Sequence, residues 1–245
     1  MRYLLLFLMM PALAVAQAPN EVIRQRLVWV RYNNQLAINP RLALHSEIDN
    51  RMYVAPFAEH HLVTRTVLRY TWLPQVEAGA GFVFALQQPH DPRTNYKLAI
   101  PELRSQQDVT LKYVAGNVNL LHRYQLDERF IRRVAGNELA PGYDFNFRFR
   151  YRLQAQVPFY KTQRYTLKLV LADELMLNFG KIIQYNVFDQ NRLYVGLQRE
   201  QAGAFSFELG YLKWYQQRPS GNSFFSRDIL RVSVFHRVSL HNPGD

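Results

Sequence analysis

Residues that could perform nucleophilic chemistry are few and unfavourably spaced in this chain of 245 residues. Serine and histidine come close together at His45-Ser46 and at Ser233 and His236. Side chains an odd number of positions apart point to opposite faces of a β-strand, so neither pair can act directly as a catalytic dyad. We predict no catalytic residue from these pairs, and a dyad assembled across strands stays open as an alternative.

Metal and acid–base chemistry also lack a convincing constellation. His60-His61, predicted to lie in a loop, has no third metal ligand nearby. The acidic pairs Asp127-Glu128 and Asp173-Glu174 are expected to pair with arginines or to mark strand ends. Because cysteine and a glycine-rich phosphate loop are absent, disulfides, thiolate metal sites and a P-loop are excluded. We therefore predict no metal and no cofactor.

The clearest pattern in the sequence is a strict alternation within residues 143–159. The apolar members of this alternation are Phe145, Phe147, Phe149, Tyr151 and Leu153. The positions between them are Asn146, Arg148, Arg150 and Arg152. A β-strand turns successive side chains to opposite faces, so the segment has one apolar and one cationic face. The alternation runs for about ten residues, the length of a tilted strand that crosses a bilayer.

Similar runs fill the chain from residue 24 onward and predict the fold class. We count about eleven runs; since bacterial barrels normally have an even number of strands, ten or twelve are expected. Longer connections at 52–61, 87–101 and 133–142 alternate with short turns. The prediction is an all-β, transmembrane, antiparallel up-and-down β-barrel of about 10–12 strands with a polar lumen.

The charged residues of the alternating runs are predicted to face the lumen. The net charge is +11, but the charges sit singly at alternate positions and not in runs, which argues against nucleic acid. Most of the lumenal charge is interpreted as a structural ion-pair network, with an anion-attracting pore as the alternative. The candidates are Glu47, Arg65, Arg69, Glu77, Arg148, Arg150, Arg152, Arg192, Glu208 and Arg231.

Residues 1–16 have the features of a secretory signal peptide, and 17–245 are predicted to form a single outer-membrane barrel domain. The expected location is the cell outer membrane, with membrane lipid and the barrel-assembly machinery as partners. The five apolar residues of 143–159 are predicted to face lipid. Tryptophans and tyrosines near strand ends, such as Trp29, Trp72 and Trp214, are expected to form interfacial belts.

Several sequence pieces resemble an uncharacterised family, the domain of unknown function 2490, which is common in Bacteroidota. The pieces are HRYQLDERF (122–130), FRFRYRLQAQVPF (147–159), DELMLNFG (173–180), FDQNRLYVGL (188–197) and FELGYLK (207–213). The resemblance covers nearly the whole mature chain and implies an outer-membrane β-barrel. Because the family's activity is unknown, it implies no catalytic residues.

The sequence thus favours an outer-membrane barrel with a structural, porin-like transport or binding role, with a small anionic solute as a candidate occupant of the lumen. A lipid- or lipopolysaccharide-modifying barrel enzyme is one alternative. A soluble periplasmic barrel that binds a ligand inside is another, because a lipocalin-like barrel has the same alternation with its apolar face turned inward.

Overall fold

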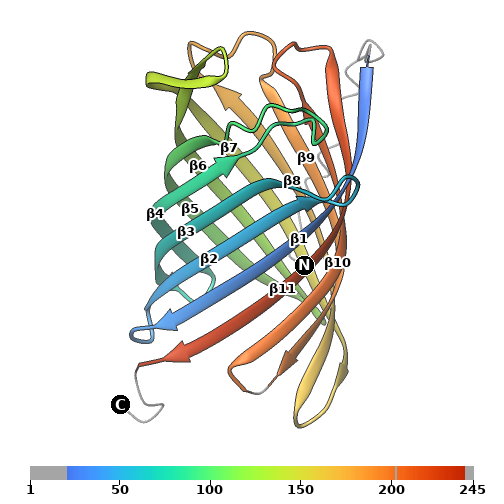
Figure 1. The fold of residues 1–245 in the computed structure, drawn as a ribbon. Coiled ribbons are helices and arrows are strands. Elements are labelled where there is room, and N and C mark those ends of the chain that lie inside the picture. Colours follow the sequence, from blue (N-terminus) through green and yellow to red (C-terminus); the bar gives the residue numbers. More distant parts are fainter. Residues whose placement is uncertain (1–20, 202, 241–245) are drawn as a thin grey trace, which may run out of the picture.

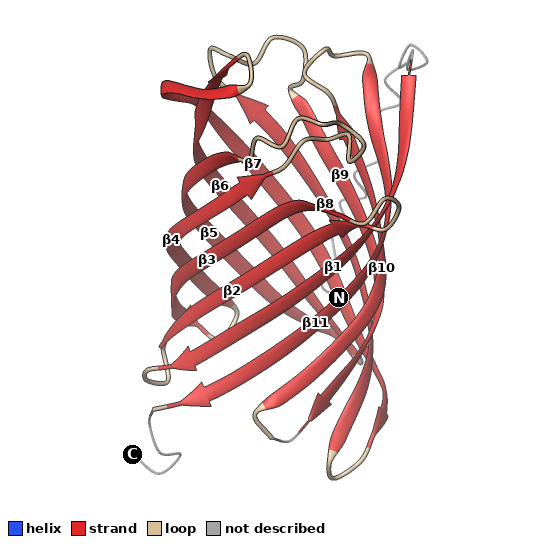
Figure 2. Ribbon diagram, in the orientation of Figure 1, coloured by secondary structure: helices blue, strands red, loops and turns tan. Residues whose placement is uncertain are grey.

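The computed structural model describes residues 21–201 and 203–240, so the predicted signal peptide lies outside the described residues. These residues form eleven β-strands (Figures 1 and 2). Their bounds are β1 Glu21–Ala37, β2 Leu42–Tyr53, β3 Ala58–Leu73, β4 Val76–Gln87, β5 Ile100–Ala115, β6 Val118–Ala135, β7 Glu138–Lys161, β8 Tyr165–Phe179, β9 Phe188–Gln201, β10 Phe205–Gln217 and β11 Ser223–Ser239. No helix suited to crossing a membrane occurs in this part of the chain.

The strands close into one barrel, which confirms the prediction of an all-β barrel fold. Each strand pairs antiparallel with its sequence neighbours, and β1 closes the ring by pairing parallel with β11, from Glu21 opposite Ser223 to Ala37 opposite Ser239. The expectation of an even strand number is wrong for the described residues, which contain eleven strands. With an odd number of alternating strands, the first and last strands run in the same direction. The ring can therefore close only by parallel pairing of β1 with β11.

The two ends of the barrel differ in the length of their connections. At one end, called here the short-turn rim, the connections are 38–41, 74–75, 116–117, 162–164 and 202–204. At the other, the long-loop rim, they are 54–57, 88–99, 136–137, 180–187 and 218–222. β1 begins at the long-loop rim and β11 ends at the short-turn rim (Figure 1).

Two of the predicted long connections are shorter in the structure. Residues 58–61 already belong to β3, so His60 and His61 lie in a strand and not in a loop. The predicted loop 133–142 is a two-residue hairpin turn, in which Gly136 supplies a φ of 60°. In the resulting β6–β7 hairpin, residues 138–146 of β7 pair with β6 alone, because pairing with β8 starts at Phe147.

The alternation of the sequence gives the wall two chemically opposite faces. The outer face carries apolar rows that run from strand to strand. One row joins five strands in register through Leu169, Leu197, Leu209, Val232 and Val30. The inner face is polar, and Asp127, Arg227 and Ser233 on it are completely buried.

Candidate functional site

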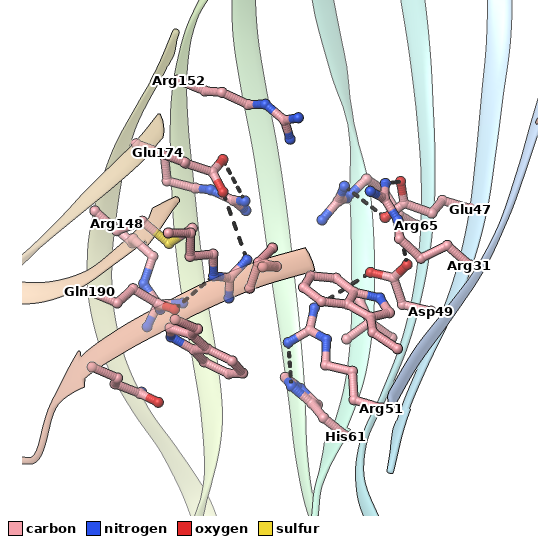
Figure 3. Close-up of a pocket in the computed structure, with 18 of the residues that line it drawn as sticks. Arg31, Glu47, Asp49, Arg51, His61, Arg65, Arg148, Arg152, Glu174 and Gln190 are labelled. Carbon is pink, nitrogen blue, oxygen red and sulfur yellow. Dashed lines mark hydrogen bonds and ion pairs between the residues drawn. The ribbon is translucent and has the colours of Figure 1, made fainter. Parts of the chain in front are cut away.

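The candidate site is a cavity of about 90 Å³ in the middle of the barrel (Figure 3). Eleven arginines line it, against only four carboxylates, those of Glu47, Asp49, Glu102 and Glu174. Its lining comes from strands all round the barrel, because each strand presents alternate residues to the interior. The cavity is the polar lumen that the alternation predicts, at its narrowest.

A second cavity, of about 450 Å³, lies on the short-turn side of the first and is called here the vestibule. Residues at the short-turn ends of strands line it, including Asn34, Lys112, Gln156 and Arg237. All ten charged residues predicted for the lumen line one or both of these spaces. Glu47, Arg65, Arg148, Arg150, Arg152, Arg192 and Arg231 line the central cavity. Arg69, Glu77 and Glu208 line the vestibule.

Each carboxylate of the central cavity is shared among several arginines. Glu174 lies 2.8 Å from Arg123, 2.9 Å from Arg150 and 3.7 Å from Arg192. Glu102 is likewise shared, with Arg104 at 2.6 Å and Arg129 at 2.5 Å.

Three further carboxylates, those of Asp127, Asp189 and Glu208, pair with lining arginines without lining the cavity themselves. Eleven arginines against seven carboxylates still leave four positive charges in excess. The ion-pair network in the lumen is therefore extensive but incomplete, and the cavity carries an excess of positive charge.

Two tryptophans stand inside the lumen, so the expectation that they belong to interfacial belts is wrong. Trp29 and Trp214 are 4% and 3% exposed, and both line the central cavity. The guanidinium of Arg51 lies 3.9 Å from the ring centre of Trp29, and that of Arg192 lies 4.6 Å from the ring centre of Trp214. These cation–π contacts stabilise arginines for which carboxylates are scarce.

A third aromatic ring lies flat against the inner wall. Gly196 and Gly210 face each other on β9 and β10, and a Cβ on either would come within 2.3 Å of the Tyr194 hydroxyl. The two glycines thus make room for the ring of Tyr194. Its hydroxyl donates a hydrogen bond to Glu208 at 2.8 Å, and Arg231 stacks on its ring at 3.5 Å.

Loop 88–99, one of the connections of the long-loop rim, extends across the barrel from β4 to contact strands on another side. It connects β4 to β5, yet the backbone oxygen of His90 accepts hydrogen bonds from Gln25 on β1 and Tyr53 on β2. The His90 ring lies 4.9 Å from that of Phe225 on β11, which stands four strands from β4 around the ring. Burial and the nearby Arg227 and Arg218 lower the pKa of His90 to about 4, so its imidazole is neutral at pH 7.

His60 and His61 belong to this closed end of the lumen. His60 is fully buried between Tyr53 and Trp214, and its two ring nitrogens have no hydrogen-bond partner. His61 contacts Arg51 through Nδ1 at 3.1 Å. The prediction of a solvated loop is wrong here because β3 already begins at Ala58, and an irregularity in its pairing with β2 at this point breaks the alternation, so that both side chains are buried. Within the described residues, no group of three metal-binding side chains forms.

The five apolar residues of 143–159 lie on the opposite face from Arg148, Arg150 and Arg152. Phe145 packs against Phe130 and Phe147, and Tyr151 packs against Tyr124.

The two members of each acidic pair lie on opposite faces of the wall. Asp127 and Glu174 point inward to arginines, whereas Glu128 accepts from Ser105 and Asp173 from Asn191.

Neither serine–histidine pair forms a dyad in the described structure. The hydroxyl of Ser233 is buried without a hydrogen-bond partner. His236 instead contacts Tyr32 through Nδ1 at 2.8 Å and stacks on Phe205.

Sequence reasoning missed several residues of the site, among them Arg31, Arg51, Arg104, Arg123 and Arg129. The signal for them exists. Arg31 is two positions from Trp29, and Arg123 and Arg129 are an even number of positions from Asp127. Residues an even number of positions apart lie on the same face of a strand. The same two-residue spacing from Arg31 would have placed Trp29 on the inner face.

Comparison with protein families identifies the family of the chain. The family model described as "Protein of unknown function (DUF2490)" matches residues 27–225. The chain belongs to this family. The match runs from within β1 to the first residues of β11, so it covers the cavity residues of β1 to β10, whereas Arg231 lies beyond it. Neither curated proteins nor solved structures gave a significant match.

Proposed function

We propose that this member of the DUF2490 family is an outer-membrane β-barrel. The observation that carries the proposal is the inverted distribution of polarity, with ion pairs inside and apolar rows outside. In the five-strand row, Leu197 and Leu209 are 57% and 55% exposed. Soluble monomers rarely expose contiguous apolar patches larger than a few hundred Å², whereas hydrocarbon would cover this face favourably.

The lumen indicates the role that such a barrel would have. The central cavity holds only a few water molecules, and loop 88–99 lies between it and the long-loop rim. The wider vestibule lies on the other side, at the short-turn rim. We propose that the short-turn rim faces the periplasm and that the lumen binds small anionic solutes from that side, in place of an open pore.

Cell fractionation tests the location. We expect the full chain in the outer-membrane fraction, extracted by detergent and not released by osmotic shock. Recovery in the osmotic-shock fluid would contradict the membrane proposal and favour the soluble periplasmic barrel.

Planar-bilayer recording tests the closed lumen. We expect the purified barrel to insert without a steady open conductance, because both the narrow central cavity and loop 88–99 obstruct the lumen. A large conductance of the unaltered protein would contradict the closed lumen while leaving the membrane location intact.

A further inference from the structure

Six residues line both the central cavity and the vestibule and so mark the boundary between them. They are Arg31, Glu47, Arg65, Arg123, Arg152 and Arg231. They come from six different strands, β1, β2, β3, β6, β7 and β11, so they surround the passage. Five positive charges and one negative charge therefore face any solute that moves inward from the vestibule.

The carboxylates at this boundary are already engaged. Glu47 pairs with both Arg31 and Arg65, Glu208 pairs with Arg231, and Arg123 uses Glu174. Arg152 differs, because no carboxylate of the described residues lies within ion-pairing distance of it. Its partner is the neutral amide of Gln154 at 2.6 Å.

Figure 3 shows the guanidinium of Arg152 pointing into the open centre of the cavity, across from Arg65 and Arg31. Glu174, opposite it on β8, attracts this guanidinium without forming an ion pair, whereas Arg123, Arg231 and Arg31 repel it. An anion placed between these groups would relieve the repulsion.

Hydrogen-bond donors without a partner also occur at this boundary. The Nε atoms of Arg65, Arg123 and Arg231 are buried and have no partner within the described residues. A buried donor without an acceptor is unfavourable, and a guanidinium donor especially so. Three such donors at one boundary indicate that an acceptor is missing from the site.

We propose that this boundary binds a small soluble oxyanion, of the phosphate, sulfate or carboxylate class, with Arg152 as its main ligand and Arg65, Arg123 and Arg231 as further donors. Guanidinium groups pair with two oxygens at once, which favours an oxyanion over chloride. The eleven-strand wall encloses the site, so the ligand is a free solute. This inference rests on the proposed role of the lumen as an anion-binding compartment.

Isothermal titration of the full chain in detergent with inorganic phosphate tests the site. We expect saturable binding that Arg152→Gln weakens by roughly tenfold or more, the usual effect of losing a hydrogen bond to a charged group. Arg152→Lys keeps the charge but loses the planar fork, so an intermediate affinity is expected. The matched control is Arg133→Gln, which removes the same charge from an exposed residue of the β6–β7 hairpin.

The outcomes that would overturn the site are specific. Absence of saturable phosphate binding to the unaltered protein would do so, as would equal losses in Arg152→Gln and Arg133→Gln. A third measurement needs no variant: phosphate should bind at least tenfold more tightly than chloride at matched ionic strength, and equal affinities would contradict an oxyanion site.

Failure of this inference is distinguishable from failure of the proposed function. Titration in detergent measures binding wherever the protein resides in the cell, whereas fractionation measures location alone. Phosphate binding by a protein found in the periplasmic fluid would keep the site and remove the membrane proposal.

Discussion

At the scale of single residues, Arg150 and Arg152 illustrate how neighbouring inward positions on one strand can have different roles. Arg150 lies between two acids, 2.9 Å from Glu174 and 3.5 Å from Asp127. Arg152, two positions along β7, has an amide partner and cationic neighbours. We therefore assign Arg150 to the stability of the barrel and Arg152 to its ligand.

The contrast predicts that matched substitutions at Arg150 and Arg152 differ in how much they change the stability of the barrel. Arg150→Gln leaves the buried carboxylate of Asp127 without its arginine and should destabilise the barrel by about 3–5 kcal/mol. Arg152→Gln leaves no acid without an ion pair, because Glu174 keeps Arg123, Arg150 and Arg192, so a change below about 1 kcal/mol is expected. Urea-induced unfolding from lipid vesicles measures both free energies. Equal destabilisation by the two substitutions would contradict the assignment.

The glycine pair beneath Tyr194 gives a second prediction at this scale. In Gly210→Ala the new methyl group would overlap the Tyr194 ring, so we expect a loss of about 1–3 kcal/mol from overpacking. Gly203→Ala in the β9–β10 turn is the control, because nothing lies within 4 Å of its Cβ position. The double variant with Tyr194→Ala should recover part of the loss in the same unfolding assay; strict additivity would exclude the steric explanation.

At the scale of elements, loop 88–99 carries a titratable group, His90, whose charge bears on how the loop docks. The pKa of His90 is about 4 in the docked loop, below the ordinary value near 6.5, because of burial and the charges of Arg227 and Arg218. His60 and Phe225 are the other rings packed near it. Protonation of His90 therefore opposes docking of the loop.

The sign of the pH dependence follows from that lowered pKa. Docking should be fully favourable above pH 6.5 and should weaken by up to roughly 3 kcal/mol as the pH falls from 6.5 to 4. The protection factors of amides 91 and 93–97, which correct for the pH dependence of intrinsic hydrogen exchange, should fall as the pH is lowered over this window in the unaltered protein. In His90→Gln the exchange should lose that pH step, and a step of unchanged size would show that another group controls the loop.

The strands were predictable from sequence, and their ends were less so. Period-two alternation fixed the inner face of β7 because Arg148, Arg150 and Arg152 contrast sharply with their neighbours. His60 and His61 carry no such contrast, since histidine is compatible with either a loop or a polar lumen. The positions across the barrel that meet at the anion site were also out of reach, because closure of the ring and strand register determine them.

At the scale of the whole molecule, the decisive question is which solvent covers the outer face. Leu197→Arg places a charge in the middle of the five-strand apolar row. In a lipid bilayer this should cost about 2–4 kcal/mol, whereas on a water-exposed face it would be nearly neutral. Gln198→Arg, one position along β9, points into the vestibule and is the matched control with little expected cost.

Refolding into lipid vesicles from urea measures both variants. A cost confined to Leu197→Arg supports hydrocarbon on the outer face. Equal, small effects would indicate that water covers it, and would favour the soluble periplasmic barrel over the membrane barrel.

The parallel seam between β1 and β11 has a consequence for assembly. A barrel with an even strand count starts and finishes on one side of the bilayer, so its closing strands can approach each other without translocation. Here Glu21 and Ser239 lie at opposite rims, and the seam joins segments about two hundred positions apart. If the barrel lies in the outer membrane, as we propose, a chain delivered from the periplasm has to carry the start of β1 to the far side before the ring closes, and closure of the seam is the expected last step of assembly.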